Sequence, residues 1–194
     1  MIRRLAIYCG SATPEDSRYR ELARDVGAEL ARRGIGVVYG GGRLGLMGAL
    51  ATGALREGGE VIGVIPEAMV SHEIANTECT ELRVVTGMHE RKSAFTELSD
   101  GFITLPGGVG TMDELWEAVS WAQLGYHDKP VGLLNALGFF DHLLAFNAHM
   151  AKIGFIREAH AQIIISRETL PELLEALEVY RPHRPIFNMK AQDL

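Results

Sequence analysis

Short, almost continuously apolar runs alternate with longer segments of helical periodicity along the whole chain. Strands that are covered on both faces have this apolar character, which is typical of a parallel sheet between two layers of helices. We therefore predict an α/β fold with a doubly wound, mainly parallel sheet of about seven strands between helix layers. The predicted strands span residues 4–9, 36–40, 60–66, 82–85, 101–106, 130–135 and 161–166.

Helical patterns fill the segments between these runs. In the first of them, Leu22, Val26 and Leu30 recur every four positions, as on one face of a helix. Ligands of such sheets bind beyond the carboxyl ends of the strands, so the turns that follow strands are the places to search for a site. The predicted helices span residues 18–33, 111–124, 139–153 and 169–180, with a further helix within residues 87–100.

The length of the chain favours one domain. A chain of 194 residues, 47% of them hydrophobic, can bury one sizeable core and is short for two. We predict a single domain over residues 1–180. Residues 181–194, RPHRPIFNMKAQDL, contain two prolines and little periodicity, so we predict an irregular tail that packs on the domain or on a partner.

Charge and hydropathy exclude several classes of partner. A net charge of -6 and a pI of about 5.6 give no basic surface that would hold nucleic acid or anionic lipid. The N-terminal apolar run ends at Gly10, too early for a secretory signal, and no stretch approaches the roughly 18 apolar residues of a membrane span. We expect a cytoplasmic protein with no nucleic-acid partner and no membrane association.

Cysteine and histidine usage gives no sign of a metal centre. The two cysteines, Cys9 and Cys79, form no disulfide framework and lack the spacing of a zinc site. The seven histidines are scattered without a ligand-pair spacing. We expect reduced thiols and no metal.

Three of the predicted strand-to-helix turns are rich in glycine: CGSATPEDS, YGGGRLGLMGALA and PGGVGT. Glycine lets the backbone approach a ligand closely, and the free N–H groups of the following helix attract an anion. Phosphate is the simplest occupant, and close packing of helix on sheet is the alternative explanation for each turn. No turn carries the Lys-Ser/Thr of a Walker A sequence. The candidate phosphate-binding residues are Gly10, Ser11, Gly41, Gly42 and Gly107.

Carboxylates and cations accompany the third turn. Asp113 and Glu114 fall in the predicted first turn of the next helix, where carboxylates are also simply good helix starters. Arg91 and Lys92 begin the preceding helix and should face the same end of the sheet. A carboxylate and cations around a backbone nest suit a ligand with a phosphate and a centre where positive charge develops. A sugar phosphate with a leaving group at its anomeric carbon is such a ligand.

These residues carry a resemblance to a known family. MHERK at 88–92, followed by PGGVGTMDE at 106–114, resembles the Lonely guy family, the cytokinin riboside 5'-monophosphate phosphoribohydrolases, whose signature is PGGxGTxxE. YGGGRLGLMGALA and SWAQLGYHDKPVGLLN extend the similarity over nearly the whole chain. Members were often labelled lysine decarboxylases. The resemblance implies a Rossmann-like fold and hydrolysis of nucleoside monophosphates.

The resemblance also implies roles for individual residues. Arg91 and Glu114 match the paired catalytic positions of the family. Val109 replaces the tyrosine usual in the plant motif, Asp113 replaces a glutamate, and Arg43 stands where serine is common, which puts the base preference in doubt. The residues that match substrate-binding positions are Glu73, Lys92, Gly108, Val109, Gly110, Thr111, Met112, Asp113 and Ser120. Met47 and Met88 are candidates for the base pocket, with core filling as the alternative.

The chemistry of N-glycosidic cleavage agrees with these assignments. Cleavage builds oxocarbenium character at the anomeric carbon, so an ionised carboxylate lowers the barrier by its charge or by orienting the attacking water. Glu114 is the predicted carboxylate. Arg91 is always protonated and is a poor proton donor, so its predicted role is positioning and electrostatic stabilisation.

We therefore expect hydrolysis of purine nucleoside 5'-monophosphates, N6-substituted adenine nucleotides or AMP, to free base and ribose 5-phosphate, with no organic cofactor and no metal. The alternative is a non-catalytic nucleotide- or molybdenum-cofactor-binding carrier of the same fold, which would have no use for Glu114. We also predict a homodimer, because Trp116, Trp121 and Phe95 extend the apolar surface of two helices beyond one face.

Overall fold

The computed structural model describes residues 1–70 and 75–187. Within these residues, the strands form one sheet in the order β4-β3-β2-β1-β5-β6-β7, and each neighbouring pair is parallel. The predicted Rossmann-like, doubly wound fold is thereby confirmed. The strands are β1 (Arg4–Tyr8), β2 (Gly36–Tyr39), β3 (Val61–Pro66), β4 (Glu81–Val85), β5 (Gly101–Thr104), β6 (Val131–Leu134) and β7 (Ile164–Arg167).

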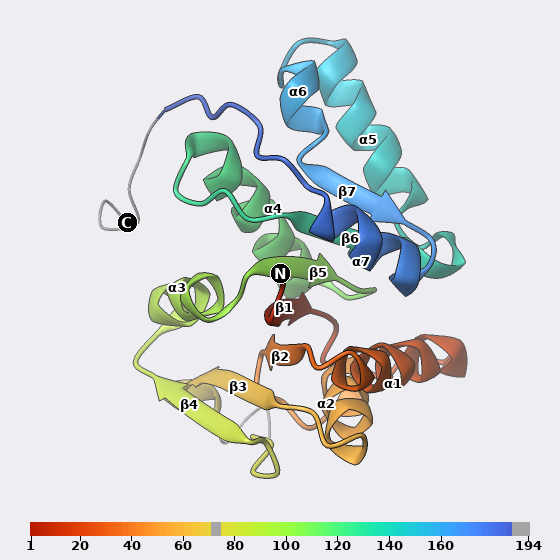
Figure 1. Ribbon diagram of the computed structural model, residues 1–194, viewed down its shortest axis with the longest axis vertical. Helices are drawn as coiled ribbons and strands as arrows, with labels where there is room; N and C mark the ends of the chain where they lie inside the picture. The colour runs from red at the N-terminus through yellow and green to blue at the C-terminus, as the bar shows by residue number, and fades with distance from the viewer. Residues whose placement is uncertain (71–74, 188–194) are drawn as a thin grey trace.

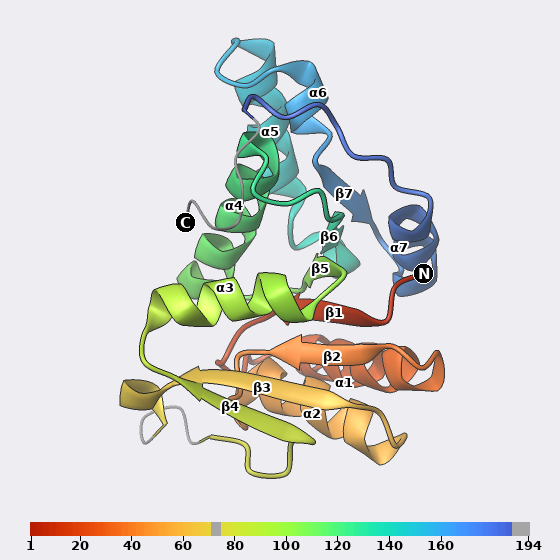
Figure 2. The ribbon, with the colours of Figure 1, turned by 60° about the vertical axis from the view of Figure 1, so that its left-hand side comes forward.

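Helices cover both faces of the sheet, with α1 and α2 on one side and α3 and α4 on the other (Figures 1 and 2). The α-helices are α1 (Ser17–Arg32), α2 (Gly45–Arg56), α3 (Met88–Leu98), α4 (Val109–Leu124), α5 (Asp141–Lys152), α6 (Glu158–Ala161) and α7 (Leu170–Glu178). Two short 3-10 turns, η1 (Glu67–Met69) and η2 (Ala136–Gly138), follow β3 and β6.

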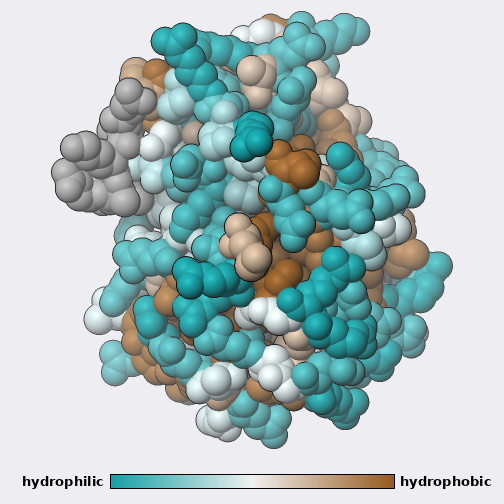
Figure 3. All heavy atoms as spheres, viewed as in Figure 1, coloured by the Kyte–Doolittle hydropathy of each residue, from teal (hydrophilic) through white to brown (hydrophobic). Residues whose placement is uncertain are grey.

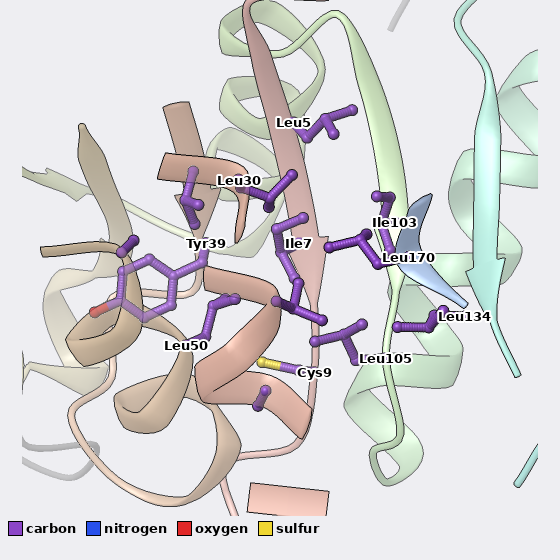
Figure 4. Packing of buried hydrophobic residues seen from close by; sticks show 14 of the residues in the cluster. Leu5, Ile7, Cys9, Leu30, Tyr39, Leu50, Ile103, Leu105, Leu134 and Leu170 are labelled. Carbon is purple, nitrogen blue, oxygen red and sulfur yellow. The ribbon is translucent and has the colours of Figure 1, made fainter. Parts of the chain in front are cut away.

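The alternation of side chains along each strand divides the core into two clusters. On β1, Leu5 and Ile7 pack toward α1, α2 and α7, whereas Ala6 and Tyr8 pack toward α3, α4 and α5. Figure 4 shows the first cluster, in which Ile7 lies near Leu50 of α2. Apolar residues on both faces of a strand produce the continuous runs seen in the sequence.

Two glycines bring α1 and α2 unusually close together. A Cβ atom on Gly27 would lie 2.1 Å from the carbonyl oxygen of Leu50, and one on Gly53 would lie 2.0 Å from that of Arg24. Real Cβ atoms do not approach backbone oxygens this closely, so any side chain at either position would force the two helices apart. The backbones of α1 and α2 are therefore in direct contact.

The last predicted strand begins later than expected. Residues 161–163 were predicted to belong to it, but β7 begins at Ile164. Ala161 instead ends α6, where the Asn147 side chain donates a hydrogen bond to its carbonyl oxygen at 2.9 Å. This tertiary contact favours a helical turn over extension of the strand.

The chain after α7 follows the C-terminal end of α4. The Ile186 N–H donates to the Gln123 carbonyl at 2.9 Å, and His183 Nε2 lies 3.2 Å from the Ala122 carbonyl oxygen. The predicted irregular tail thus packs on the body as far as residue 187, and residues 188–194 lie outside the described residues. Most of the face in Figure 3 is hydrophilic. No helix of the described segments combines the length and apolarity needed to cross a membrane.

Candidate active site

The three glycine-rich turns meet because their strands are neighbours in the sheet. β1 lies between β2 and β5, so the turns after these strands emerge side by side. The Gly10 N–H donates to the Pro106 carbonyl at 3.1 Å, and the Gly10 carbonyl accepts from the N–H groups of Leu46 and Met47 at 3.1 and 3.2 Å. The first turn is therefore joined through its backbone to the other two.

The start of α4 provides backbone donors in the third turn. Gly108 is the N-cap of α4, and its carbonyl accepts the first intrahelical bond from the Met112 N–H at 3.1 Å. The N–H groups of Val109, Gly110 and Thr111 consequently have no acceptor within the helix. A Cβ on Gly108 or Gly110 would meet no atom within 4 Å, so the backbone is open on this side. Such a helix start suits an anion.

Gly107 has a different function in the same turn. A Cβ there would lie 2.1 Å from Thr111 Oγ1 and 2.8 Å from the Gly10 nitrogen. This glycine allows the first and third turns to pack against each other. The packing explanation applies to Gly107, whereas the open backbone at Gly108 and Gly110 leaves room for a ligand.

A cavity of about 290 Å³ lies over these turns. Its walls combine the open backbone of the turns, three charged side chains (one arginine and two carboxylates) and three methionines from different elements. It is lined by Cys9, Gly10, Ser11, Ala12, Met47, Met69, Met88, Arg91, Gly108, Val109, Gly110, Thr111, Asp113 and Glu114.

Arg91 and Glu114 form a buried pair of opposite charge in the cavity wall. Arg91 Nη2 lies 3.8 Å from Glu114 Oε1, and the two residues are only 3% and 8% exposed. The Arg91 guanidinium also donates to the Gly40 carbonyl at 3.4 Å and lies 5.5 Å from the centre of the Phe95 ring. Its buried Nε has no hydrogen-bond partner among the described residues. Charges so far from water interact strongly with each other and with a bound ligand.

Gly40 leaves the space that this arrangement needs, a role that was not predicted from the sequence. A Cβ on Gly40 would lie 2.3 Å from Arg91 Nη2 and 3.0 Å from Met47 Cε. Gly40 immediately follows β2, so only a residue without a side chain leaves space for the guanidinium there. The YGGG run was a signal for close approach, but it did not tell which glycine needed the space.

Lys92 lies beside the cavity and pairs with carboxylates of α4. Its Nζ is 2.8 Å from Glu117 Oε2 and 3.0 Å from Asp113 Oδ2. Burial opposes the charge on Lys92, but the hydrogen bonds that its ammonium group donates to Glu117 and Asp113 outweigh this effect and raise the pKa of Lys92. Lys92 therefore connects α3 to α4 as a cation paired with two carboxylates. Met112, from the same predicted set, packs against the core rather than lining the cavity.

Several predicted positions lie elsewhere. The Gly41 carbonyl accepts from the Asn76 N–H at 2.8 Å, and Gly42 pairs with Ala75 in an isolated bridge, so neither lines the cavity. Their role in phosphate binding stays a prediction. Ser120 lies on the exposed side of α4, at a second cavity of about 320 Å³ between α4 and α5. Glu73 lies outside the described residues.

The prediction that Asp113 and Glu114 occupy the first turn of a helix is wrong. The helix begins at Val109, two residues earlier than predicted, and its first turn contains no acidic residue. Glu114 is instead directed into the cavity wall from the second turn. Its position is therefore not explained by the preference of carboxylates for helix starts.

Comparison with solved structures shows the fold. The molybdenum cofactor carrier protein of Chlamydomonas reinhardtii superposes with a TM-score of 0.67 at 19% identity, over 92% of this chain and 97% of that one. The molybdenum cofactor binding protein of Rippkaea orientalis gives 0.68, also at 19% identity, over 92% and 96%. At this identity the likeness concerns architecture alone.

Sequence comparison is more specific. Residues 47–177 match the family described as "Possible lysine decarboxylase". The cytokinin riboside 5'-monophosphate phosphoribohydrolase LOG of Oryza sativa subsp. japonica is 49% identical over 93% of this chain and 74% of its own length. The Arabidopsis thaliana enzyme LOG4, of the same description, is 48% identical over 92% of this chain and 83% of its own length. With such identity along nearly the whole chain, and with PGGVGTMDE at the cavity, this protein belongs to the Lonely guy family of cytokinin riboside 5'-monophosphate phosphoribohydrolases.

Proposed function

We propose that this protein hydrolyses the N-glycosidic bond of purine nucleoside 5'-monophosphates to free base and ribose 5-phosphate. The observation that carries the proposal is the buried pair of Arg91 and Glu114 beside the open backbone at the start of α4. Glu114 supplies a negative charge for the anomeric carbon, and the N–H groups at the start of α4 supply hydrogen-bond donors for a phosphate. Both lie at one cavity.

The geometry suggests an orientation for the substrate. The phosphate would accept hydrogen bonds from the N–H groups at the start of α4, which places the ribose near Glu114. The base would then extend toward Met47, Met69 and Met88, which line the cavity from α2, η1 and α3. Flexible thioether side chains adapt to apolar groups of different shape. This supports N6-substituted adenine nucleotides as substrates, with AMP as a smaller alternative.

In the proposed reaction, the bond between C1' and the purine nitrogen breaks and its electron pair leaves with the base. The oxygen of a water molecule bonds to C1', and the proton that this water loses ends on the base. Glu114 stabilises the positive charge that develops at the sugar and orients the water. The guanidinium of Arg91 positions the substrate and stabilises negative charge, since it does not give up a proton. Each step uses groups of this chain and water alone.

The phosphate provides the first test. The purified protein should convert AMP or N6-isopentenyl-AMP to base and ribose 5-phosphate, and the matching nucleosides should show a kcat/KM at least about 100-fold lower, because they forfeit the charge-assisted contacts at the start of α4. Chromatography of the products measures both rates. Equal rates would contradict the proposed orientation, and binding of AMP without any product would favour a carrier.

We also propose that the protein is a homodimer that uses the outer face of α4. The second cavity exposes an apolar groove between α4 and α5, lined by Trp116 and by Phe146, which is 56% exposed. Exposed apolar grooves of this kind mark interaction surfaces. The predicted contribution of Phe95 is wrong, because this side chain is 1% exposed and packs in the core of its own chain.

Light scattering at micromolar concentration should report about twice the 21.2 kDa mass of the chain. The Phe146→Glu variant should shift the mass toward that of one chain, because a two-fold contact would bury the new charge. Val179→Glu, at a 75% exposed position on another face, is the matched control and should leave the mass unchanged. A monomeric wild-type protein would rule the dimer out.

A further inference from the structure

A second charged site lies outside the active-site cavity, in a groove of about 530 Å³ between α1 and α2. Figure 1 shows these two helices side by side, on the side of the sheet away from α3 and α4. The groove is lined by Thr13, Ser17, Arg20, Glu21, Arg24, Arg43, Leu44, Gly45, Gly48, Ala49, Thr52 and Arg56. Four arginines against one glutamate give it a positive charge, in a chain whose net charge is -6.

Three of the four arginines have no ion-pair partner within the described part of the chain. Arg20, Arg43 and Arg56 make no salt bridge there, and the fourth, Arg24, reaches only its neighbour Asp25 at 3.5 Å. Some arginines elsewhere are held by carboxylates, such as Arg18 by Asp16 and Arg33 by Glu29, and others, such as Arg157 and Arg167, have no ion pair on the described surface. The groove differs in that it gathers three such unpaired arginines, with Arg24 beside them, around a single glutamate.

Two of these arginines lie close enough on one helix to repel each other when no anion is bound. Arg20 and Arg24 are four residues apart on α1, and like charges at this spacing repel each other on a helix. Arg56, at the end of α2, and Arg43, just before its start, face the same groove. The close contact of α1 and α2 at Gly27 and Gly53 fixes the distance between the arginines of α1 and those at the two ends of α2.

The groove offers hydrogen-bond donors that match phosphate. Guanidinium groups bind phosphate oxygens in pairs, and the hydroxyls of Thr13, Ser17 and Thr52 add further donors. Several arginines spread along a groove match a chain of phosphates better than one phosphate. We propose that this groove binds an oligophosphate group, either inorganic triphosphate or the phosphate chain of a nucleoside triphosphate.

This site is separate from the cavity that contains Arg91 and Glu114. Ser11 and Ala12 line the active-site cavity, and the next residue, Thr13, lines the groove, so the first glycine-rich turn lies between the two. Among the residues that the structure describes, none lines both. A ligand in the groove is thus additional to the substrate, and the inference does not depend on the proposed reaction.

Calorimetric titration of the whole chain with inorganic triphosphate, and separately with ATP, tests the proposal. Each should bind in the groove, and inorganic monophosphate should bind much more weakly. The double variant Arg20→Ala/Arg56→Ala should lose about tenfold or more in affinity for triphosphate, because it removes two charged donors. Equal affinity for triphosphate and ATP would identify the phosphate chain as the recognised group, and tighter binding of ATP would add a contact to the nucleoside.

Two controls distinguish the groove from general attraction and from the active-site cavity. Arg157→Ala/Arg167→Ala removes the same charge from exposed positions elsewhere and should bind triphosphate as the wild type does. Gly110→Glu puts a carboxylate at the open start of α4 and should also leave this binding unchanged. The proposal is overturned if the groove variant binds like the wild type, if the distant arginine variant loses as much affinity, or if only Gly110→Glu abolishes binding.

Discussion

Replacing Glu114 by glutamine should lower kcat for a nucleoside 5'-monophosphate by about 100-fold to 1000-fold. The amide has nearly the shape of the carboxylate but no charge, so it cannot stabilise the oxocarbenium character of the transition state. Since Glu114 is 8% exposed and lies 3.8 Å from the guanidinium of Arg91, its charge acts in a site from which water is largely excluded. KM should change much less than kcat, because the interaction strengthens only in the transition state.

Glu117→Gln is the matched control for this variant. Glu117 lies three residues further along α4 and pairs with Lys92, but it does not line the cavity. Its loss should change kcat only slightly. Circular dichroism should show both variants folded. If Glu114→Gln turns over substrate at nearly the wild-type rate, the proposed role of the carboxylate is wrong and the carrier alternative gains support.

Arg91→Ala should lower kcat/KM by about 100-fold or more. The guanidinium is held by the Gly40 carbonyl, by the face of Phe95 and by Glu114, so its position is fixed before substrate binds. Alanine removes the charge and these fixed donors together. Arg91→Lys restores the positive charge but lacks the planar guanidinium group, which can donate two parallel hydrogen bonds. This variant should therefore recover only part of the activity.

The control for this experiment is Arg83→Ala on β4, where the arginine is partly exposed and paired with Glu81. Steady-state kinetics should show no significant change in this variant. A wild-type kcat/KM in folded Arg91→Ala would remove Arg91 from the reaction. If the lysine variant were fully active, positive charge alone would be needed at this position, and the geometry of the guanidinium group would not matter.

The fold could be predicted from the sequence because it depends mainly on local patterns of apolar residues. Continuous apolar runs and four-residue repeats were sufficient to predict each strand and a doubly wound, mainly parallel sheet, but not the order of the strands in it. The error at β7 shows where local reasoning fails. Ala161 belongs to α6 because Asn147, fourteen residues earlier, bonds to its carbonyl. A contact between distant residues decided a boundary that the apolar pattern had placed differently.

The candidate site was only partly predictable for the same reason. The PGGVGT turn indicated the open backbone at Gly108 and Gly110, and Arg91 and Glu114 do meet in one cavity. The distinct functions of the glycines could not be predicted, since they depend on what faces each one in space. Gly40 makes room for Arg91 and Gly107 makes room for Thr111, yet in the sequence both resemble any other glycine of a phosphate-binding turn.

The hydrogen bonds of Gly10 have a consequence for how such an enzyme diversifies. Its N–H and carbonyl tie the first turn to the third turn and to the start of α2 through main-chain atoms alone. The frame of the site is therefore independent of most side chains around it. Replacements at Met47, Met69, Met88 or Val109 would reshape the proposed space for the base while the backbone donors stay where they are. Selectivity for the base and the capacity for cleavage can evolve as separate traits on one rigid scaffold.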